Sequence, residues 1–132
     1  MERIRVPQIG AILAHAFVGW ALCGAIMGIG MQVTSIEMTL IAHAIGAPII
    51  FTAVSMLYFT RFHYTTPLQT AVAFTSFVVF TDFFLVALLI NRSLEMFASF
   101  LGTWLPFALI FGSTYLTGLY IVGRSQTVRA AR

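Results

Sequence analysis

Four long apolar runs, separated by short polar breaks, restrict what this sequence can fold into. Each run is close to the ~20 residues that cross the hydrocarbon core of a bilayer as a helix. The chain is 60% hydrophobic and 8% charged, whereas soluble domains have about 45–50% apolar and about 25% charged residues. We therefore predict an all-α integral membrane protein whose four transmembrane helices cover residues 8–31, 38–60, 67–90 and 95–122.

The breaks between the runs predict how these helices are arranged. Most turn-forming and charged residues lie in the segments QVTSIE, RFHYTTP and NRSLE. Connections this short make each helix antiparallel to the one before it. The sequence thus predicts a single domain over residues 1–132, an antiparallel up-down-up-down bundle that ends in an Arg-rich tail at residues 123–132.

The arginines predict the orientation, because the chain contains no lysine. Arg3, Arg5, Arg61 and the arginines of the C-terminal tail fall on one side of the four predicted spans, and only Arg92 falls on the other. Positive charge is enriched on the cytoplasmic side, so we expect both termini in the cytoplasm and the chain in the cytoplasmic (inner) membrane. No basic patch with interleaved aromatic residues indicates a nucleic-acid partner.

The strongest functional candidates are two ionisable residues inside the spans, His43 and Asp82. A carboxyl at the centre of a transmembrane helix costs about 2.5–3.5 kcal/mol on insertion, so it usually has a partner and often a role. At 1.5 Å per residue, His43 lies roughly 7 Å from the outer start of its span, and Asp82 roughly 12 Å from the outer end of the third span. We expect these side chains to meet directly or through one water, and to bind a proton or cation or to pair two helices.

Four further polar residues extend this pair toward the cytoplasmic side. His15 and Thr75 are expected roughly 10–12 Å from the inner ends of their helices, in one layer. Ser113 and Thr117 lie on one side of the fourth span. Together these residues predict a polar track through the bundle. The competing interpretation is structural, since interhelical polar contacts are worth about 0.6 kcal/mol on average and hydroxyls often bond their own helix.

The sequence predicts no cofactor and no metal site. His15 and His43 each occupy an A-H-A motif, but antiparallel helices would separate them axially by about 10 Å or more, too far to ligate one haem together. No two His, Asp or Glu residues have the i, i+3 or i, i+4 spacing of a preorganised zinc site. The single Cys23 cannot form an intrachain disulfide, and we expect it to pack as a small apolar residue.

The first span also carries a candidate interface with a second copy of the chain. Gly24 and Gly28 form a G-x-x-x-G motif on the side of the helix opposite His15. Such motifs let two transmembrane helices approach closely, so a homodimer through this face is expected. The other expected partners are the lipid bilayer itself and further membrane proteins.

Three function classes are compatible with these features. The favoured class is a proton- or cation-linked transporter or channel component that uses Asp82 and His43. An accessory or assembly subunit of a larger membrane complex would need no site of its own. An intramembrane enzyme would use the same pair as general acid and base on a lipid-like substrate, but we assign no residue a catalytic role.

Overall fold

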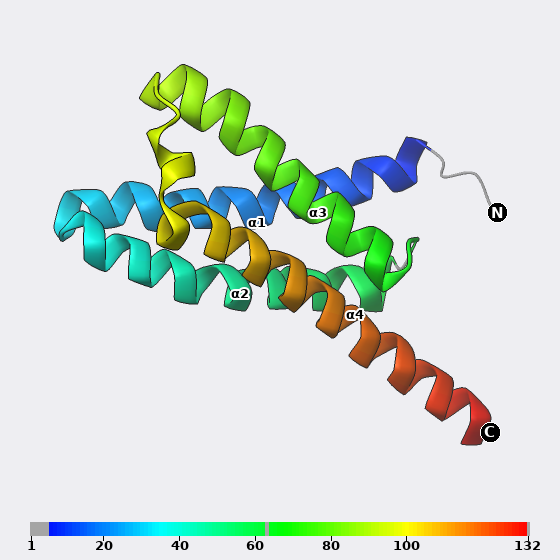
Figure 1. Ribbon diagram of the computed structural model, residues 1–132. Helices are drawn as coiled ribbons and strands as arrows, with labels where there is room; N and C mark the ends of the chain where they lie inside the picture. Colours follow the sequence, from blue (N-terminus) through cyan, green and yellow to red (C-terminus); the bar gives the residue numbers. More distant parts are fainter. Residues whose placement is uncertain (1–5, 63, 132) are drawn as a thin grey trace.

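The computed structural model describes residues 6–62 and 64–131, which form helices and no strand (Figure 1). The elements in chain order are α1 (Val6–Val33), α2 (Ile36–Arg61), α3 (Pro67–Thr81), the π-helix η1 (Asp82–Asn91), the 3-10 turn η2 (Glu95–Ala98), the short π-helix η3 (Phe100–Trp104) and α4 (Leu105–Ala131). Four stretches are long and apolar enough to cross a membrane: Val6–Val33, Ile36–Arg61, Pro67–Asn91 and Phe100–Ala131. The expected all-helical fold is confirmed.

The four stretches match the apolar runs of the sequence to within a few residues, apart from the two ends of the fourth. Residues 95–98 form the separate turn η2, so the fourth helical stretch starts at Phe100. At its other end, α4 continues to Ala131, so the Arg-rich segment is helical. Arg3, Arg5 and Arg132, which contribute to the expected orientation, lie outside the described residues.

Capping residues in the breaks explain where two of the helices begin. The Ser35 side chain accepts a hydrogen bond from the Met38 N–H at 3.2 Å, which satisfies one of the free N–H groups at the start of α2. Thr66 and Gln69 form a reciprocal capping box at the start of α3, and Pro67 occupies the first turn. These local signals lie in the breaks that the sequence places between spans.

Each of the four long helices packs against two of the others (Figure 1). α2 lies between α1 and α4, and α3 also lies against α1 and α4. α2 and α3 are therefore diagonal to each other, with no comparable packing between them in the described part of the chain. The α1–α2 connection and η2 lie at one end of the molecule, and the α2–α3 connection and the end of α4 lie toward the other.

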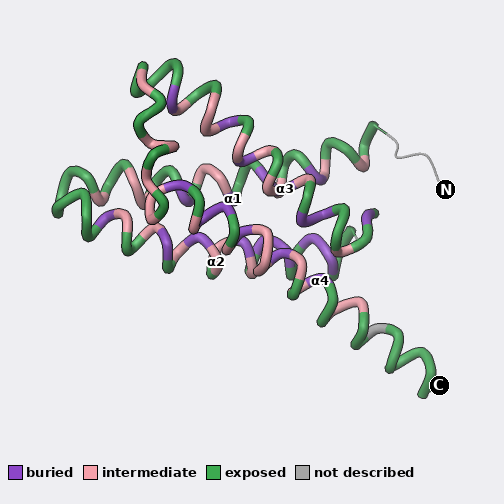
Figure 2. Tube along the Cα trace, viewed as in Figure 1, coloured by how far each residue is buried: buried purple, intermediate pink, exposed green. Residues whose placement is uncertain are grey.

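Aromatic side chains fill the region where the helices cross, and glycines on the facing helices leave space for them. Phe51 of α2 and Phe74 of α3 are fully buried, with ring centroids 6.2 Å apart. A Cβ added at Gly19 of α1 would lie 2.6 Å from the Phe51 ring, and one at Gly118 of α4 would lie 2.7 Å from Phe59. Any larger residue at either position would force a shift of the ring or of the helix, so glycine favours this close approach. Figure 2 shows the buried residues concentrated at these crossings.

The π-helix η1 is the least packed part of the third helix. It continues from α3 but has no comparable packing against α1, α2 or α4 among the described residues. Ala87 is the one buried residue of its ten. Figures 1 and 2 show η1 leaning away from the other helices with its surface exposed. π-helical turns are rare and often occur at functional sites, which draws attention to the residue where η1 begins.

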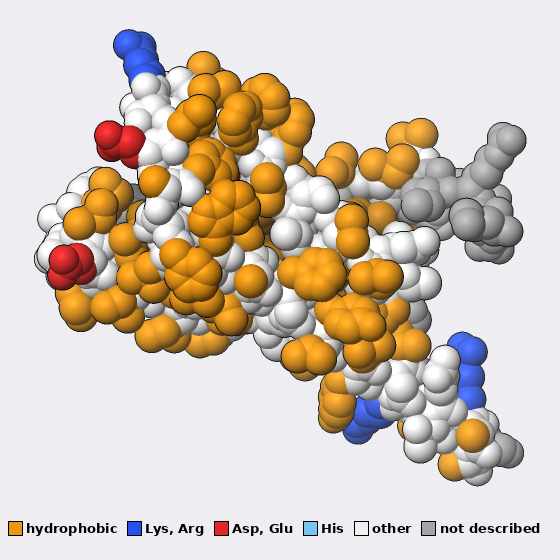
Figure 3. All heavy atoms as spheres, viewed as in Figure 1, with side chains coloured by type: hydrophobic (Ala, Val, Ile, Leu, Met, Phe, Trp, Pro, Cys, Tyr) orange, Lys and Arg blue, Asp and Glu red, His pale blue; other side chains and the backbone are white. Residues whose placement is uncertain are grey.

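The surface between the two ends of the molecule is mostly apolar (Figure 3). Large hydrophobic side chains are exposed on every long helix. The charged side chains visible in Figure 3 lie toward the ends. Described charged residues in or beside the connections and at the C-terminal end of α4 are Glu37, Arg61, Arg92, Glu95, Arg124 and Arg129. An apolar band between charged ends is the distribution that a helical protein needs to cross a bilayer.

Candidate functional site

Asp82 occupies the junction between α3 and η1, inside the third apolar stretch. Its Oδ1 accepts a hydrogen bond from the indole Nε1–H of Trp20 on α1, at 2.9 Å. The bond joins the first and third helices at the point where the third helix leaves the bundle. Asp82 is therefore a half-buried carboxyl held by one neutral donor from a neighbouring helix.

Few other polar groups surround this bond. Trp20 is half-buried and packs against the aromatic core. The thiol of Cys23, one turn further along α1, is buried and close enough to Asp82 to interact with it electrostatically. Within the described residues, no side chain forms an ion pair with Asp82. A carboxyl in these surroundings can exchange a proton without first breaking a salt bridge.

His43 lies on the side of α2 that faces α1, and its Nδ1 is buried with no hydrogen-bond partner among the described residues. Two close approaches fix its level along α1. A Cβ at Gly30 would lie 2.6 Å from Thr39, and a Cβ at Gly46 would lie 2.6 Å from Ile26. His43 is therefore opposite positions 26–30 of α1.

The structure does not bring His43 and Asp82 together as a hydrogen-bonded pair. Asp82 takes its hydrogen bond from Trp20, and position 26 of α1 is six residues beyond Trp20, roughly 9 Å along the helix. In addition, their helices α2 and α3 are diagonal rather than adjacent. The predicted direct contact is therefore absent between these two described residues, and a role for each of them stays a prediction.

His15 contacts α2 at the other half of the molecule. Its Nδ1 lies 2.7 Å from the Ala11 carbonyl oxygen, so the imidazole bonds within its own helix. The ring meets Tyr58 and Phe62 edge to face, with centroids 5.5 and 5.0 Å away. His15 also borders a cavity of about 140 Å³ between α1 and α2, whose other lining residues are apolar. These contacts describe a packed histidine with a satisfied ring nitrogen.

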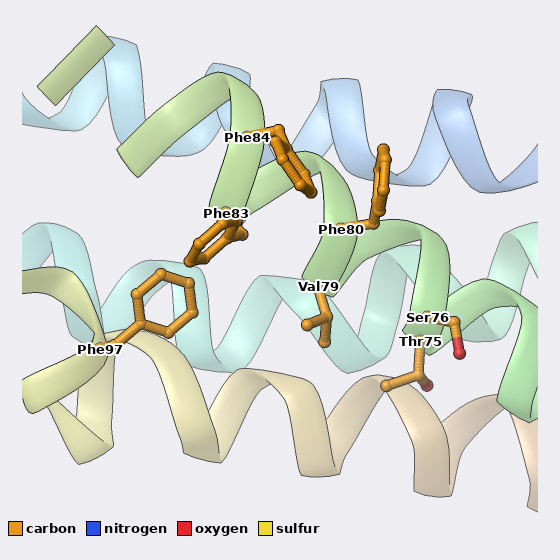
Figure 4. A pocket seen from close by; sticks show the side chains of 7 residues that line it. All are labelled: Thr75, Ser76, Val79, Phe80, Phe83, Phe84 and Phe97. Carbon is orange, nitrogen blue, oxygen red and sulfur yellow. The ribbon is translucent and has the colours of Figure 1, made fainter. Parts of the chain in front are cut away.

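Thr75 lines a groove along the third helix, to which His15 does not contribute (Figure 4). The groove has a volume of about 410 Å³, and four phenylalanines line most of it, with Thr75 and Ser76 at one end: Phe80, Phe83, Phe84 and Phe97. The hydroxyl oxygen of Thr75 is buried and has no hydrogen-bond partner among the described residues. Neither Asp82 nor His43 lines this groove.

The buried face of α4 differs from the face expected to carry the polar track. Ser113 is half-buried and its hydroxyl donates to the Ile110 carbonyl oxygen of its own helix, at 3.2 Å. Thr117 is also half-buried. The fully buried hydroxyl on this helix belongs to Thr114, which lies on the same face as Ile110 and Gly118. A pathway through Ser113 and Thr117 would therefore run along the edge of α4.

The structure also shows a buried hydroxyl chain that the sequence does not reveal. The Tyr58 hydroxyl lies 2.7 Å from the Thr65 hydroxyl, which lies 2.6 Å from that of Thr70. Thr70 in turn donates to the Thr66 carbonyl oxygen at 2.8 Å. The chain ties α2, the α2–α3 connection and α3 together. The sequence signal for this chain is a tyrosine near the end of the second span followed by a threonine cluster at the start of the third.

Two further buried hydroxyls, those of Ser55 and Thr114, have no hydrogen-bond partner among the described residues. Gly118 of α4 contacts Phe59 of α2, and one turn earlier on each helix lie Thr114 and Ser55. The two hydroxyls therefore lie at a common level of the α2–α4 interface. On α2, Ser55 lies between Tyr58 of the hydroxyl chain and Phe51 of the aromatic contact, so polar groups extend from that chain toward the middle of the bundle.

The structure offers no preassembled metal centre within the residues that it describes, since His, Cys, Asp and Glu nowhere gather in groups of three. Comparisons with known proteins identify no relative. No protein-family model matches the chain, no curated protein is similar to it, and no solved structure resembles it.

Proposed function

We propose that this chain is a four-span protein of the cytoplasmic membrane and a component of a proton- or cation-linked transport system, with Asp82 as the ion-binding carboxyl. Its four apolar helices are inserted up-down-up-down, and both termini face the cytoplasm. The apolar band between charged ends supports insertion (Figure 3). Arg61, Arg124 and Arg129 at one end outnumber Arg92 at the other, which supports the orientation.

The observation that carries the proposal is the state of Asp82. A carboxyl within a span is costly to insert, and such residues mark ion and proton pathways. Asp82 has a donor, Trp20, but no cationic side chain among the described residues to neutralise it permanently. It is also placed where the third helix changes from α to π geometry, a feature that recurs at functional sites.

Unpartnered polar atoms on both sides of Asp82 along the bundle support a route to it. Toward one end lies the Nδ1 of His43, and toward the other lie the hydroxyls of Ser55, Thr75 and Thr114. Buried polar groups normally have partners, so each of these atoms is a position where a water molecule would gain hydrogen bonds.

Flux measurements on reconstituted protein test the proposal. Purified wild-type protein in liposomes is expected to carry a proton or cation current under an imposed gradient, and Asp82→Asn is expected to abolish it. Asparagine keeps an oxygen acceptor for the Trp20 N–H but cannot ionise, so the fold should persist. Glu95→Gln removes an exposed carboxyl in η2 and is the matched control, with unchanged flux. Equal flux through wild type and Asp82→Asn would overturn the proposal.

A second candidate function, an accessory subunit of a larger membrane complex, has its own supporting observation. Apart from the bond of its first residue, Asp82, to Trp20 of α1, η1 packs little against the other long helices within the described chain, so its apolar face is open to a partner. Gly24 and Gly28 also face open space, where a second copy of α1 would fit. This candidate predicts that cross-linking in native membranes captures a distinct membrane protein at η1 or a second copy at α1, and that Asp82→Asn leaves assembly and function intact.

A further inference from the structure

We infer that the ligand of the Asp82 site is a proton rather than a metal ion, and that the Trp20 indole is the positioning group whose hydrogen bond reports the state of the carboxyl. This inference rests on the proposed function, because it names the species that Asp82 binds. It follows from the number of oxygen atoms around the carboxyl and from the chemistry of the group that contacts it.

Among the described residues, the side chains that contact or interact with Asp82 are those of Trp20 and Cys23, and they supply no oxygen ligand for a metal ion. Calcium takes six to eight oxygen ligands, magnesium needs an octahedral set, and channel sites for monovalent ions use rings of carbonyl oxygens. The neighbours of Asp82 along η1, Phe83 to Ala87, are apolar. The hydroxyl of Thr81 points back along its helix and donates to the Phe77 carbonyl oxygen at 2.7 Å. A single carboxylate suffices for a proton.

The contact from Trp20 also opposes a metal ion. An indole N–H is a donor only, so Trp20 supplies no ligand to a metal ion, and it already occupies one of the two carboxylate oxygens. A proton can bind the second carboxylate oxygen while Oδ1 continues to accept from Trp20. When the proton binds, a charge-assisted hydrogen bond becomes a neutral one, and the electronic environment of the indole changes.

Few other titratable groups lie on the helices and turns around Asp82. On α1, Cys23 is the nearest, and His15 lies further along and contacts α2. η2, which reaches the third helix through the Phe83–Phe97 ring contact, contributes the exposed Glu95. The described titratable and charged residues of α4 begin more than two turns after its start: Tyr115, Tyr120, Arg124 and Arg129. A change in the Trp20 signal that depends on Asp82 therefore has one assignable source.

The chain supplies its own reporter and its own control, because it has two tryptophans and a single aspartate. Trp104→Phe leaves Trp20 as the only indole, and its fluorescence can be titrated with acid in lipid nanodiscs. Trp20→Phe leaves Trp104, whose indole donates to the Phe97 carbonyl oxygen at 2.7 Å, an acceptor that does not ionise. Glu95→Gln is added to both backgrounds, because Glu95 lies only two residues from Phe97.

The expected result is a one-proton transition in the Trp20 emission that is lost when Asp82→Asn is added and is absent from the Trp104 control. At fixed pH, replacing choline with sodium, potassium, magnesium or calcium is expected to leave the emission unchanged. A cation response that requires Asp82 would overturn the inference while leaving ion-linked transport standing. A proton transition without any flux in liposomes would instead overturn the proposed function and leave the inference intact.

A second measurement avoids substitution at the site. Because Asp82 is the only aspartate, cell-free synthesis with aspartate labelled with carbon-13 at the side-chain carboxyl makes its carbon the one labelled carboxyl. Its solid-state NMR shift is expected to follow the same transition as the Trp20 emission, with a changed midpoint in Trp20→Phe. If the labelled carbon does not titrate between pH 4 and pH 9, the role given to Asp82 is refuted. If it titrates identically in wild type and Trp20→Phe, the role given to Trp20 is refuted.

Discussion

The close approach of α1 and α2 at Gly19 makes a sharp test of the bundle. A Cβ at Gly19 would lie 2.6, 2.8 and 3.0 Å from three carbons of the Phe51 ring. Phe51 has no exposed surface and packs against Phe74, so its ring has little room to move. Gly19→Ala therefore forces either the ring or the helix to shift, and overpacking of this kind costs about 1–3 kcal/mol of stability.

Gly24→Ala is the matched control on the same helix, because a Cβ there meets no atom within 4 Å. Replacing glycine by alanine inside a helix is itself favourable by about 1 kcal/mol. This gain applies to both substitutions, so the difference between the two variants isolates the contact with Phe51. We expect Gly19→Ala to be less stable than Gly24→Ala by about 1–3 kcal/mol.

The assay is reversible unfolding in mixed micelles, in which the denaturing detergent is titrated and helix content is followed by circular dichroism. The reasoning fails if the free energies of unfolding of the two variants agree within error. Loss of stability in Gly24→Ala alone, together with dissociation of a dimer, would place Gly24 in an interface between two copies and support the homodimer proposed through α1.

Two further predictions use the same preparation, and a third uses sealed membrane vesicles. Thr114→Val should leave stability unchanged or slightly raised, because the Thr114 hydroxyl has no partner among the described residues. Thr70→Val should lower stability by about 1 kcal/mol, because it breaks the Tyr58–Thr65–Thr70 chain. If Thr114→Val were the less stable of the two variants, the hydrogen bonds described would be contradicted. Trp20→Phe should cost about 0.6 kcal/mol and at most about 1.7 kcal/mol, the average and the maximum measured for interhelical hydrogen bonds in membranes. A free energy of unfolding equal to wild type would mean that the Asp82 bond adds no stability. In a Cys23→Ala background, cysteines placed at Ser93 and Gln126 should react with an impermeant thiol reagent from opposite sides of the membrane, and labelling of both from one side would refute the topology.

The sequence predicts the number, type and approximate bounds of the long helices because these depend on local signals. Apolar length sets each span, and capping residues such as Ser35 and Thr66 set where two of them begin. The sequence does not reveal that the third span changes to π geometry at Asp82, since no proline or glycine marks the change. It also does not indicate which helices are diagonal, because that depends on packing between segments far apart in the chain.

The buried face of α4 shows how a small error in phase changes a site. Hydroxyls at Ser113 and Thr117 align on one side of the helix and suggest a ladder. The side that is buried carries Phe107, Ile110 and Thr114 instead, and Ser113 and Thr117 are rotated from Thr114 by roughly 100° and 60°, respectively. α4 has no continuous polar stripe that would reveal the rotation. Packing of Gly118 against Phe59 and Pro67 selects the face, and those partners are known only once the fold is known.

The partner of Asp82 follows once its neighbouring helices are known. α3 lies against α1 and α4, and α1 carries four strong side-chain donors of which Trp20 alone is near the centre of the helix: Gln8, His15, Trp20 and Gln32. The same reasoning accounts for His43. The segment of α1 opposite it reads IMGIG, which has no polar side chain, so the buried Nδ1 finds no partner there. A polar residue within a span takes its partner from an adjacent helix at its own level, and depth measured from the helix ends cannot replace knowledge of that neighbour.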